Sequence, residues 1–143
     1  KKQKIPTEIP FFAKVASVSC GNEHTICKDT SGLVWTFGDN SYGQLGHGDT
    51  KTRQNPTQIQ NLPKVTKVSC GYNHSCCLDV NGSAWFFGYG EQGQLGLGKF
   101  VSMNTPKRVP NMKIIISVMC GWFHSCVVDV EENCFIFGNN NFG

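Results

Sequence analysis

The stretch Cys20-Gly-Asn-Glu-His24 decides the fold of this chain, because it recurs as Cys70-Gly-Tyr-Asn-His74 and again as Cys120-Gly-Trp-Phe-His124. The copies lie fifty residues apart, with no insertion or deletion between them. Further positions share this offset: Asp29, Asp79 and Asp129; Trp35, Trp85 and Phe135; Gly38, Gly88 and Gly138; Pro6, Pro56 and Pro106. A fixed period of this length is typical of repeat architectures.

We therefore predict a single repeat array over residues 1–143. Its units are approximately 13–62, 63–112 and an incomplete 113–143. Residues 1–12 are interpreted as the end of a preceding unit, with an outer strand near Ile5 to Ile9.

Each unit shows the pattern of short strands. Residues 15–20 alternate with a period of two, and residues 113–120 are apolar on both faces, as in a strand covered on both sides. A second strand is expected from His24 to Lys28, and a third carries two aromatic residues. A fourth, outer strand is expected after Pro56 and after Pro106, since proline suits an edge strand.

Turn residues separate the second and third strands. Asn81-Gly82 is a strong hairpin signal, because both residue types tolerate a positive φ. The third copy has Glu132-Asn133 there, and we expect Asn133 to take the left-handed conformation. Four short antiparallel strands per unit predict an all-β fold of β-propeller blades, about three blades forming a partial propeller.

Three motifs at these spacings, Cys-Gly-x-x-His, Trp-x-Phe-Gly and Gly-Gln-Leu-Gly-x-Gly, resemble the repeats of the Regulator of Chromosome Condensation family. The resemblance covers essentially the whole chain and implies part of a seven-bladed propeller, to which this chain supplies at most three blades. An arc of three blades leaves two blade faces exposed, so self-association through these faces is expected.

Composition excludes several classes of protein. Charged residues are 16% and hydrophobic residues 39% of the 143, which fits a folded domain. The net charge of +3 is too small and scattered to indicate direct nucleic-acid binding. No apolar run approaches the length of a membrane span. The lack of a secretory signal predicts an intracellular setting, cytoplasmic or nuclear.

The residues that suggest catalysis or metal binding recur in every copy. A histidine present three times is not a single active site, so these histidines are expected to tie adjacent strands together by hydrogen bonds. The aspartates at 29, 79 and 129 are expected to bond their own turns. The glycine-rich loops lack the Lys-Ser/Thr of a phosphate loop. We therefore expect no enzyme and no cofactor.

The eight cysteines invite a metal or disulfide interpretation. Internal comparison favours core packing, because Cys76 and Cys126 share their repeat position with Ile26, while Cys134 shares its position with Val34 and Ala84. Zinc sites need converging pairs of ligands, which this spacing lacks. Metal binding and disulfides stay open as alternatives, and no metal is expected.

Function is expected where the copies differ. Between Cys-Gly and His the copies read Asn22-Glu23, Tyr72-Asn73 and Trp122-Phe123, in a two-residue turn on one rim of the propeller. These six residues are the candidate partner-binding site, since exposed aromatics are typical anchors and this rim often faces a partner in the family. Packing against a neighbouring loop is the alternative. Further candidates on variable loops are Asp39, Asn40, Tyr42, Tyr89, Glu91 and Phe100.

The sequence thus predicts a protein–protein interaction module. The resemblance adds an alternative, part of a guanine-nucleotide exchange factor for a Ran-like small GTPase, although the family's founding member uses an inserted hairpin for which the unbroken period leaves no room. The plant UV-B photoreceptor has similar repeats with Gly-Trp-Arg-His-Thr. Here Gly121-Trp122-Phe123-His124-Ser125 has Phe123 in place of the arginine, so light sensing is not expected.

Overall fold

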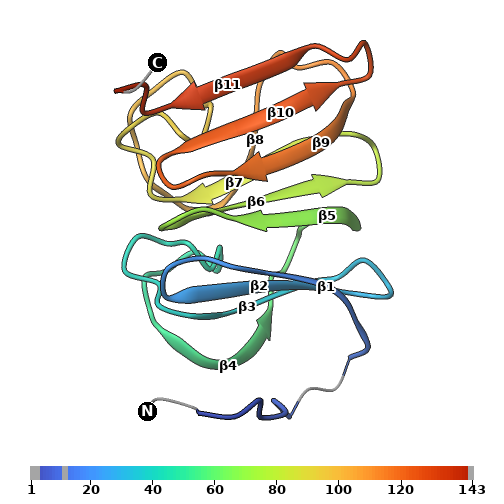
Figure 1. Ribbon diagram of the computed structural model, residues 1–143, viewed down its shortest axis with the longest axis vertical. Coiled ribbons are helices and arrows are strands. Elements are labelled where there is room, and N and C mark those ends of the chain that lie inside the picture. The colour runs from blue at the N-terminus through green and yellow to red at the C-terminus, as the bar shows by residue number, and fades with distance from the viewer. Residues whose placement is uncertain (1–3, 11–12, 142–143) are drawn as a thin grey trace.

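The computed structural model describes residues 4–10 and 13–141, and this part of the chain forms three antiparallel sheets that follow one another like blades (Figure 1). Blade 1 contains β1 (Val15–Cys20), β2 (His24–Asp29), β3 (Val34–Gly38) and β4 (Arg53–Gln58). Blade 2 contains β5 (Val65–Cys70), β6 (His74–Asp79), β7 (Ala84–Gly88) and β8 (Met103–Arg108). Blade 3 contains β9 (Ile115–Cys120), β10 (His124–Asp129) and β11 (Cys134–Gly138).

Within each blade the strands pair in chain order, and the first strands β1, β5 and β9 contact one another from blade to blade. Blade 3 has three strands in the described part. The predicted all-β fold, an arc of about three propeller blades with up to four antiparallel strands each, is confirmed. No helix of the described residues has the length and hydropathy needed to cross a membrane.

Each β2–β3 hairpin, or its equivalent, is closed by its aspartate. The Oδ1 atom of Asp29 accepts the backbone N–H groups of Ser31 and Leu33 at 2.8 and 2.9 Å, and Oδ2 accepts the indole N–H of Trp35 at 3.1 Å. Burial alone would raise the pKa of Asp29, but these hydrogen bonds outweigh it and hold the pKa below its ordinary value. The predicted turn role of the aspartates is confirmed.

Blade 3 closes the same hairpin differently. The side chain of Phe135 has no N–H to donate, and Asn133 Nδ2 donates to both carboxylate oxygens of Asp129 instead, at 3.1 and 3.2 Å. The left-handed residue is Glu132, with φ 65°, so the expectation for Asn133 was wrong. Glu132 occupies the repeat position of Gly82, with φ 75°, and the hairpin imposes that conformation at this position.

Two strand predictions are corrected. The fourth strands contain their prolines rather than follow them, since β4 covers Arg53–Gln58 and β8 covers Met103–Arg108. β4 pairs only with β3, and Pro56 lies where the register shifts, so its missing N–H removes no ladder hydrogen bond. No strand forms over residues 4–10, so the outer strand expected near Ile5 to Ile9 is not formed.

The core lies between blades. Side chains of blade 1 pack on blade 2 in one cluster, and those of blade 2 pack on blade 3 in another. The first cluster contains Ile26, Val34, Ile59, Val65, Cys70, Cys77 and Phe87. The second contains Cys76, Leu78, Ala84, Phe86, Leu95, Val109, Ile115, Val118 and Val127. Burying these apolar side chains between sheets is what holds the arc together.

Cysteines fill these clusters as predicted at Cys70, Cys76 and Cys77, whereas Cys20 and Cys134 are exposed. The strand expected to be covered on both sides, β9, is covered on one. Ile116 and Met119 are exposed, because no blade packs on that face in the described residues.

Candidate functional site

The six predicted site residues lie in three equivalent turns, which join β1 to β2, β5 to β6 and β9 to β10. In each turn the glycine N–H donates to the histidine carbonyl, at 2.8 Å in the pairs Gly21–His24 and Gly71–His74 and at 2.9 Å in the third copy. These short closures place the two variable residues of each turn on one rim of the arc, which we call the rim.

Hydrogen bonds between blades join the turns into one row. The backbone N–H of Asn22 donates to the carbonyl of Tyr72 at 3.1 Å, and the N–H of Tyr72 donates to the carbonyl of Trp122 at 3.2 Å. The row lines a shallow depression of about 240 Å³. Residues fifty apart in the sequence are therefore held as direct neighbours on one surface.

The loops after β3 and β7 begin at the same rim. The N–H of Asp39 donates to the carbonyl of Glu23, and the N–H of Tyr89 donates to the carbonyl of Asn73, each at 2.8 Å. The loop starts therefore bring further side chains beside the turns, among them Tyr42.

Five aromatic rings form a continuous aromatic strip along the rim: Trp122, Tyr72, Phe123, Tyr89 and Tyr42. In that order the ring centroids are 5.3, 5.5, 6.5 and 5.1 Å apart. Trp122 also stacks on Phe123, with 15° between the ring planes. Trp122 is 63% exposed and Tyr42 44% exposed, so the rings pack against one another and still present a surface.

The remaining candidates divide into three groups. Asn22, Glu23 and Glu91 are exposed, and Asn73 is half-buried in the middle turn. Asn40 is fully buried, where its side chain accepts the Leu45 N–H and donates to the Asp49 carbonyl, so it supports the loop and offers no surface. Phe100 is 78% exposed and lies in none of the ring contacts of the strip.

The charges on the rim are acidic. Glu23, Asp39 and Glu91 lie in segments that contain no lysine or arginine, namely residues 20–24, 39–44, 70–74, 89–94, 120–124 and 139–141. Burial would raise the pKa of Asp39, but hydrogen bonds from Ser41 and from Gln44 outweigh it and keep the pKa low. This carboxyl is therefore ionised at neutral pH.

The repeated histidines support the rim from beneath. His24 Nε2 lies 2.9 Å from Ser75 Oγ of the next blade, and Ser75 Oγ donates to the carbonyl of Gln44 at 2.9 Å. The serine therefore accepts from a neutral Nε2–H imidazole. His74 repeats the arrangement with Ser125. The expectation that these histidines tie adjacent strands is corrected, because they tie adjacent blades.

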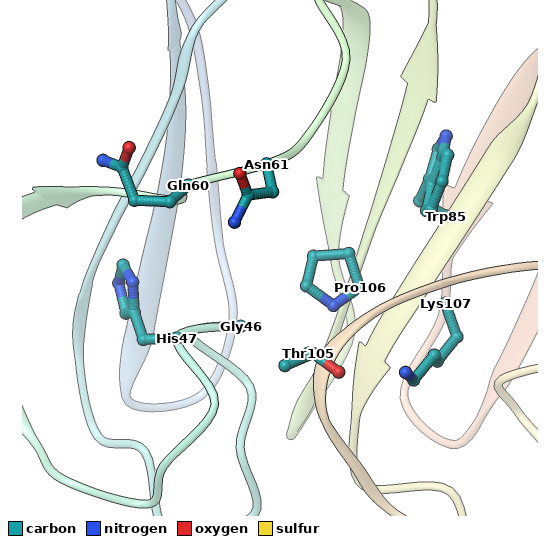
Figure 2. A pocket seen from close by; sticks show the side chains of 8 residues that line it. All are labelled: Gly46, His47, Gln60, Asn61, Trp85, Thr105, Pro106 and Lys107. Carbon is teal, nitrogen blue, oxygen red and sulfur yellow. The ribbon is translucent and has the colours of Figure 1, made fainter.

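A groove of about 380 Å³ lies at the outer edge between blades 1 and 2, away from the predicted residues. Figure 2 shows His47 and Gln60 on one side and Trp85, Pro106 and Lys107 on the other. Burial and Arg53 lower the pKa of His47 to about 4, and its Nε2 lies 2.9 Å from Thr36 Oγ1.

The sequence did not predict this groove, because the residues that line it come from two different blades. In the part of the chain that the structure describes, no three histidine, cysteine, aspartate or glutamate side chains converge as a metal site would require. The exposed aromatic side chains of the rim form a surface on which a partner can bind.

Comparison with known proteins identifies the repeat. The Regulator of chromosome condensation (RCC1) repeat matches residues 31–78 and 81–128, and a second description of the same repeat matches residues 15–44, 65–94 and 115–143. The chain belongs to the RCC1 repeat family. The resemblance expected from the three motifs is thus confirmed.

Individual relatives show how much of the fold is shared. Human WBSCR16 has a TM-score of 0.83 at 26% identity, over 95% of this chain and 37% of that chain. Yeast Prp20p from Saccharomyces cerevisiae has a TM-score of 0.77 at 24% identity, over 94% of this chain and 33% of that chain, and this likeness shows the fold alone.

Sequence similarity to another relative is local. The ultraviolet-B receptor UVR8 of Arabidopsis thaliana is 53% identical over 36 residues, which are 25% of this chain and 8% of the relative. This RCC1-repeat chain therefore spans a small part of its curated relative and about a third of its structural neighbours.

Proposed function

We propose that this RCC1-repeat chain is a protein-interaction module that binds its partner through the rim, in an intracellular setting, cytoplasmic or nuclear. The observation that carries the proposal is the exposed aromatic strip, five rings in contact across blades 1 to 3. Aromatic side chains dominate binding energy at interfaces because they bury a large apolar area with little loss of conformational freedom. The proposed contact residues are Asn22, Glu23, Tyr72, Asn73, Trp122 and Phe123.

Site-specific photo-crosslinking tests this proposal. With p-benzoylphenylalanine in place of Trp122, we expect discrete protein adducts in cells that express the chain, because position 122 would lie within the interface. Placing the same probe at Phe100, which is also highly exposed, should give none of these adducts. Excess unmodified chain should suppress the adducts, and an equal excess of Trp122→Ala chain should suppress them less. Identical adducts from both positions would contradict the proposal.

The alternative function is a part in guanine-nucleotide exchange on a Ran-like small GTPase. It is favoured by the likeness in fold to yeast Prp20p, whose structure was described with its binding properties to Gsp1p and histones. The three rim turns have equal length and carry no inserted hairpin in the described residues. We therefore expect that the chain alone changes the rate of nucleotide release from a purified Ran-type GTPase by less than about twofold, measured with a fluorescent nucleotide. Accelerated release would favour exchange.

A further part of the proposal is self-association of copies, head to tail. Val15 and Val18 are exposed on β1, and Met119 and Ile136 are exposed on blade 3. The same repeat positions are buried where two blades meet: Val65 corresponds to Val15, and Phe86 corresponds to Ile136. The exposed faces of blades 1 and 3 could therefore pack on each other in the way that adjacent blades already pack. Light scattering should show mass increasing with concentration, and Val18→Asp should return a monomer. A constant monomeric mass of the unmodified chain would refute self-association.

A further inference from the structure

We propose that the rim recognises a positively charged segment of its partner, with arginine or lysine side chains placed over the aromatic strip and beside the rim carboxylates. The inference rests on the proposed protein-binding function and adds the chemical class of the partner. Three features of the rim point to it: the arrangement of the rings, the sign of the charges, and an acidic groove at one end of the strip.

The rings offer faces to a cation. Trp122 and Tyr42, at the two ends of the strip, are 63% and 44% exposed, and Tyr72 and Phe123 lie between them. A guanidinium or ammonium group is attracted to the negative face of an aromatic ring, most strongly to that of tryptophan. Steps of 5.1 to 6.5 Å between centroids provide several such faces along an extended segment.

Carboxylates supply the complementary charge. Glu23 and Asp39 belong to the turn and loop start of blade 1, which are joined by the hydrogen bond between Asp39 N–H and the Glu23 carbonyl. The low pKa of Asp39 keeps its charge at neutral pH. The rim segments themselves contain no lysine or arginine.

The strip ends at a groove of about 360 Å³ between the loops of blades 1 and 2. Tyr42 belongs both to the strip and to the lining of this groove, in which Glu91 is the single charged side chain. A long cationic side chain that lies on Tyr42 can therefore reach an opposite charge.

Other partner chemistries fit less well. An apolar partner would remove the hydrating water from the carboxylates of Glu23, Asp39 and Glu91 and would offer no hydrogen bonds in its place. An acidic peptide or a nucleic acid would be repelled by the same three carboxylates. The rim thus combines attraction to one sign of charge with rejection of the other, which is how charged interfaces select partners.

The test uses fluorescence anisotropy with dye-labelled peptides and the full chain. A hexa-arginine peptide is expected to bind, at least tenfold more tightly than hexa-glutamate, a neutral Gly-Ser peptide of equal length or a single-stranded oligonucleotide. Added salt should weaken binding, since exposed charge attraction is screened. Equal or tighter binding of hexa-glutamate, the neutral peptide or the oligonucleotide would overturn the proposal.

Variants then locate the binding. Trp122→Ala and Tyr42→Ala should each weaken hexa-arginine binding about fivefold, the double variant Glu23→Gln/Glu91→Gln at least fivefold, and Phe100→Ala less than twofold. Equal effects of Trp122→Ala and Phe100→Ala would overturn the assignment to the strip. Photo-crosslinking at position 122 separates the two proposals. If partner adducts form but hexa-arginine does not compete with them, the cationic chemistry is wrong and the protein-binding function stands.

Discussion

Replacement of Gly71 by alanine is expected to lower the free energy of unfolding by about 4 kcal/mol. Gly71 lies at the centre of the arc, under the middle turn of the rim. A Cβ atom there would overlap the imidazole of His74 and approach the carbonyl oxygen of Gly121 at 2.5 Å. Neither neighbour can give way easily, because the imidazole is fully buried and the carbonyl belongs to the first strand–turn junction of the next blade.

The loss has two parts. Forcing an extra carbon into a packed site costs up to about 3 kcal/mol. Displacing His74 also breaks its 2.9 Å hydrogen bond to Ser125, which costs about 1 kcal/mol more. The backbone of Gly71 has no positive φ, so the cost comes from space rather than from strained dihedral angles.

Gly98→Ala is the matched control. Gly98 has φ 70°, but nothing lies within 4 Å of the position of its added Cβ. That substitution should cost only the preference for the left-handed conformation, about 1 kcal/mol. Urea unfolding followed by tryptophan fluorescence measures both variants. Equal losses would show that the packing of glycine against histidine does not determine stability.

The sequence predicted the parts of the fold that are local. The alternation in β1 and the aspartates at the hairpins are each visible within one unit, and the fifty-residue offset is visible when the units are aligned; each was confirmed. The fourth strands were expected to follow their prolines, but β4 and β8 contain them. The position of a proline in these edge strands depends on the register shift opposite it. The left-handed conformation was expected at Asn133 and occurs at Glu132, because the hairpin, and not the residue type, sets the dihedral angles there.

Contacts between copies were harder to predict. His24 bonds to Ser75, fifty-one residues away, so the pair appears only when blades are placed side by side. The aromatic strip was predicted in fragments for the same reason. Tyr72, Trp122 and Phe123 stood out as variable turn residues, whereas the contact between Tyr42 and Tyr89 depends on how two long loops pass each other. Aligning the copies shows the residues that they share, but it does not show the contacts between one unit and the next.

Stability is expected to fall by about 3 kcal/mol as the pH is lowered from about 6.5 to about 4, owing to His24 alone. Burial, together with the neighbouring His74, lowers the pKa of His24 from 6.5 to about 4. In this pH window the unfolded chain binds a proton that the folded chain excludes. The contribution is therefore complete above pH 6.5 and is lost as the pH falls toward 4.

The physical cause is the direction of one hydrogen bond. His24 Nε2–H donates to Ser75, and Nδ1 is buried with no hydrogen-bond partner among the described residues. A proton added at Nδ1 would place a charged, unsatisfied donor in the interface between blades 1 and 2. The aspartates with lowered pKa values, such as Asp29 and Asp129, act in a separate window, below about 3.8.

His24→Gln tests the assignment, because glutamine can donate a hydrogen bond but does not titrate. We expect this variant to be less stable at pH 7.5. Between pH 6.5 and 4, its free energy of unfolding should depend on pH less steeply, by the uptake of about one proton on unfolding. Urea unfolding at intervals of half a pH unit measures both. His47→Gln is the comparison, since His47 also has a pKa of about 4 but is only half-buried and should contribute less. An unchanged slope in His24→Gln would mean that the imidazoles between the blades do not control acid stability. A flattened slope would tie the acid limit of the fold to the same histidines that support the rim.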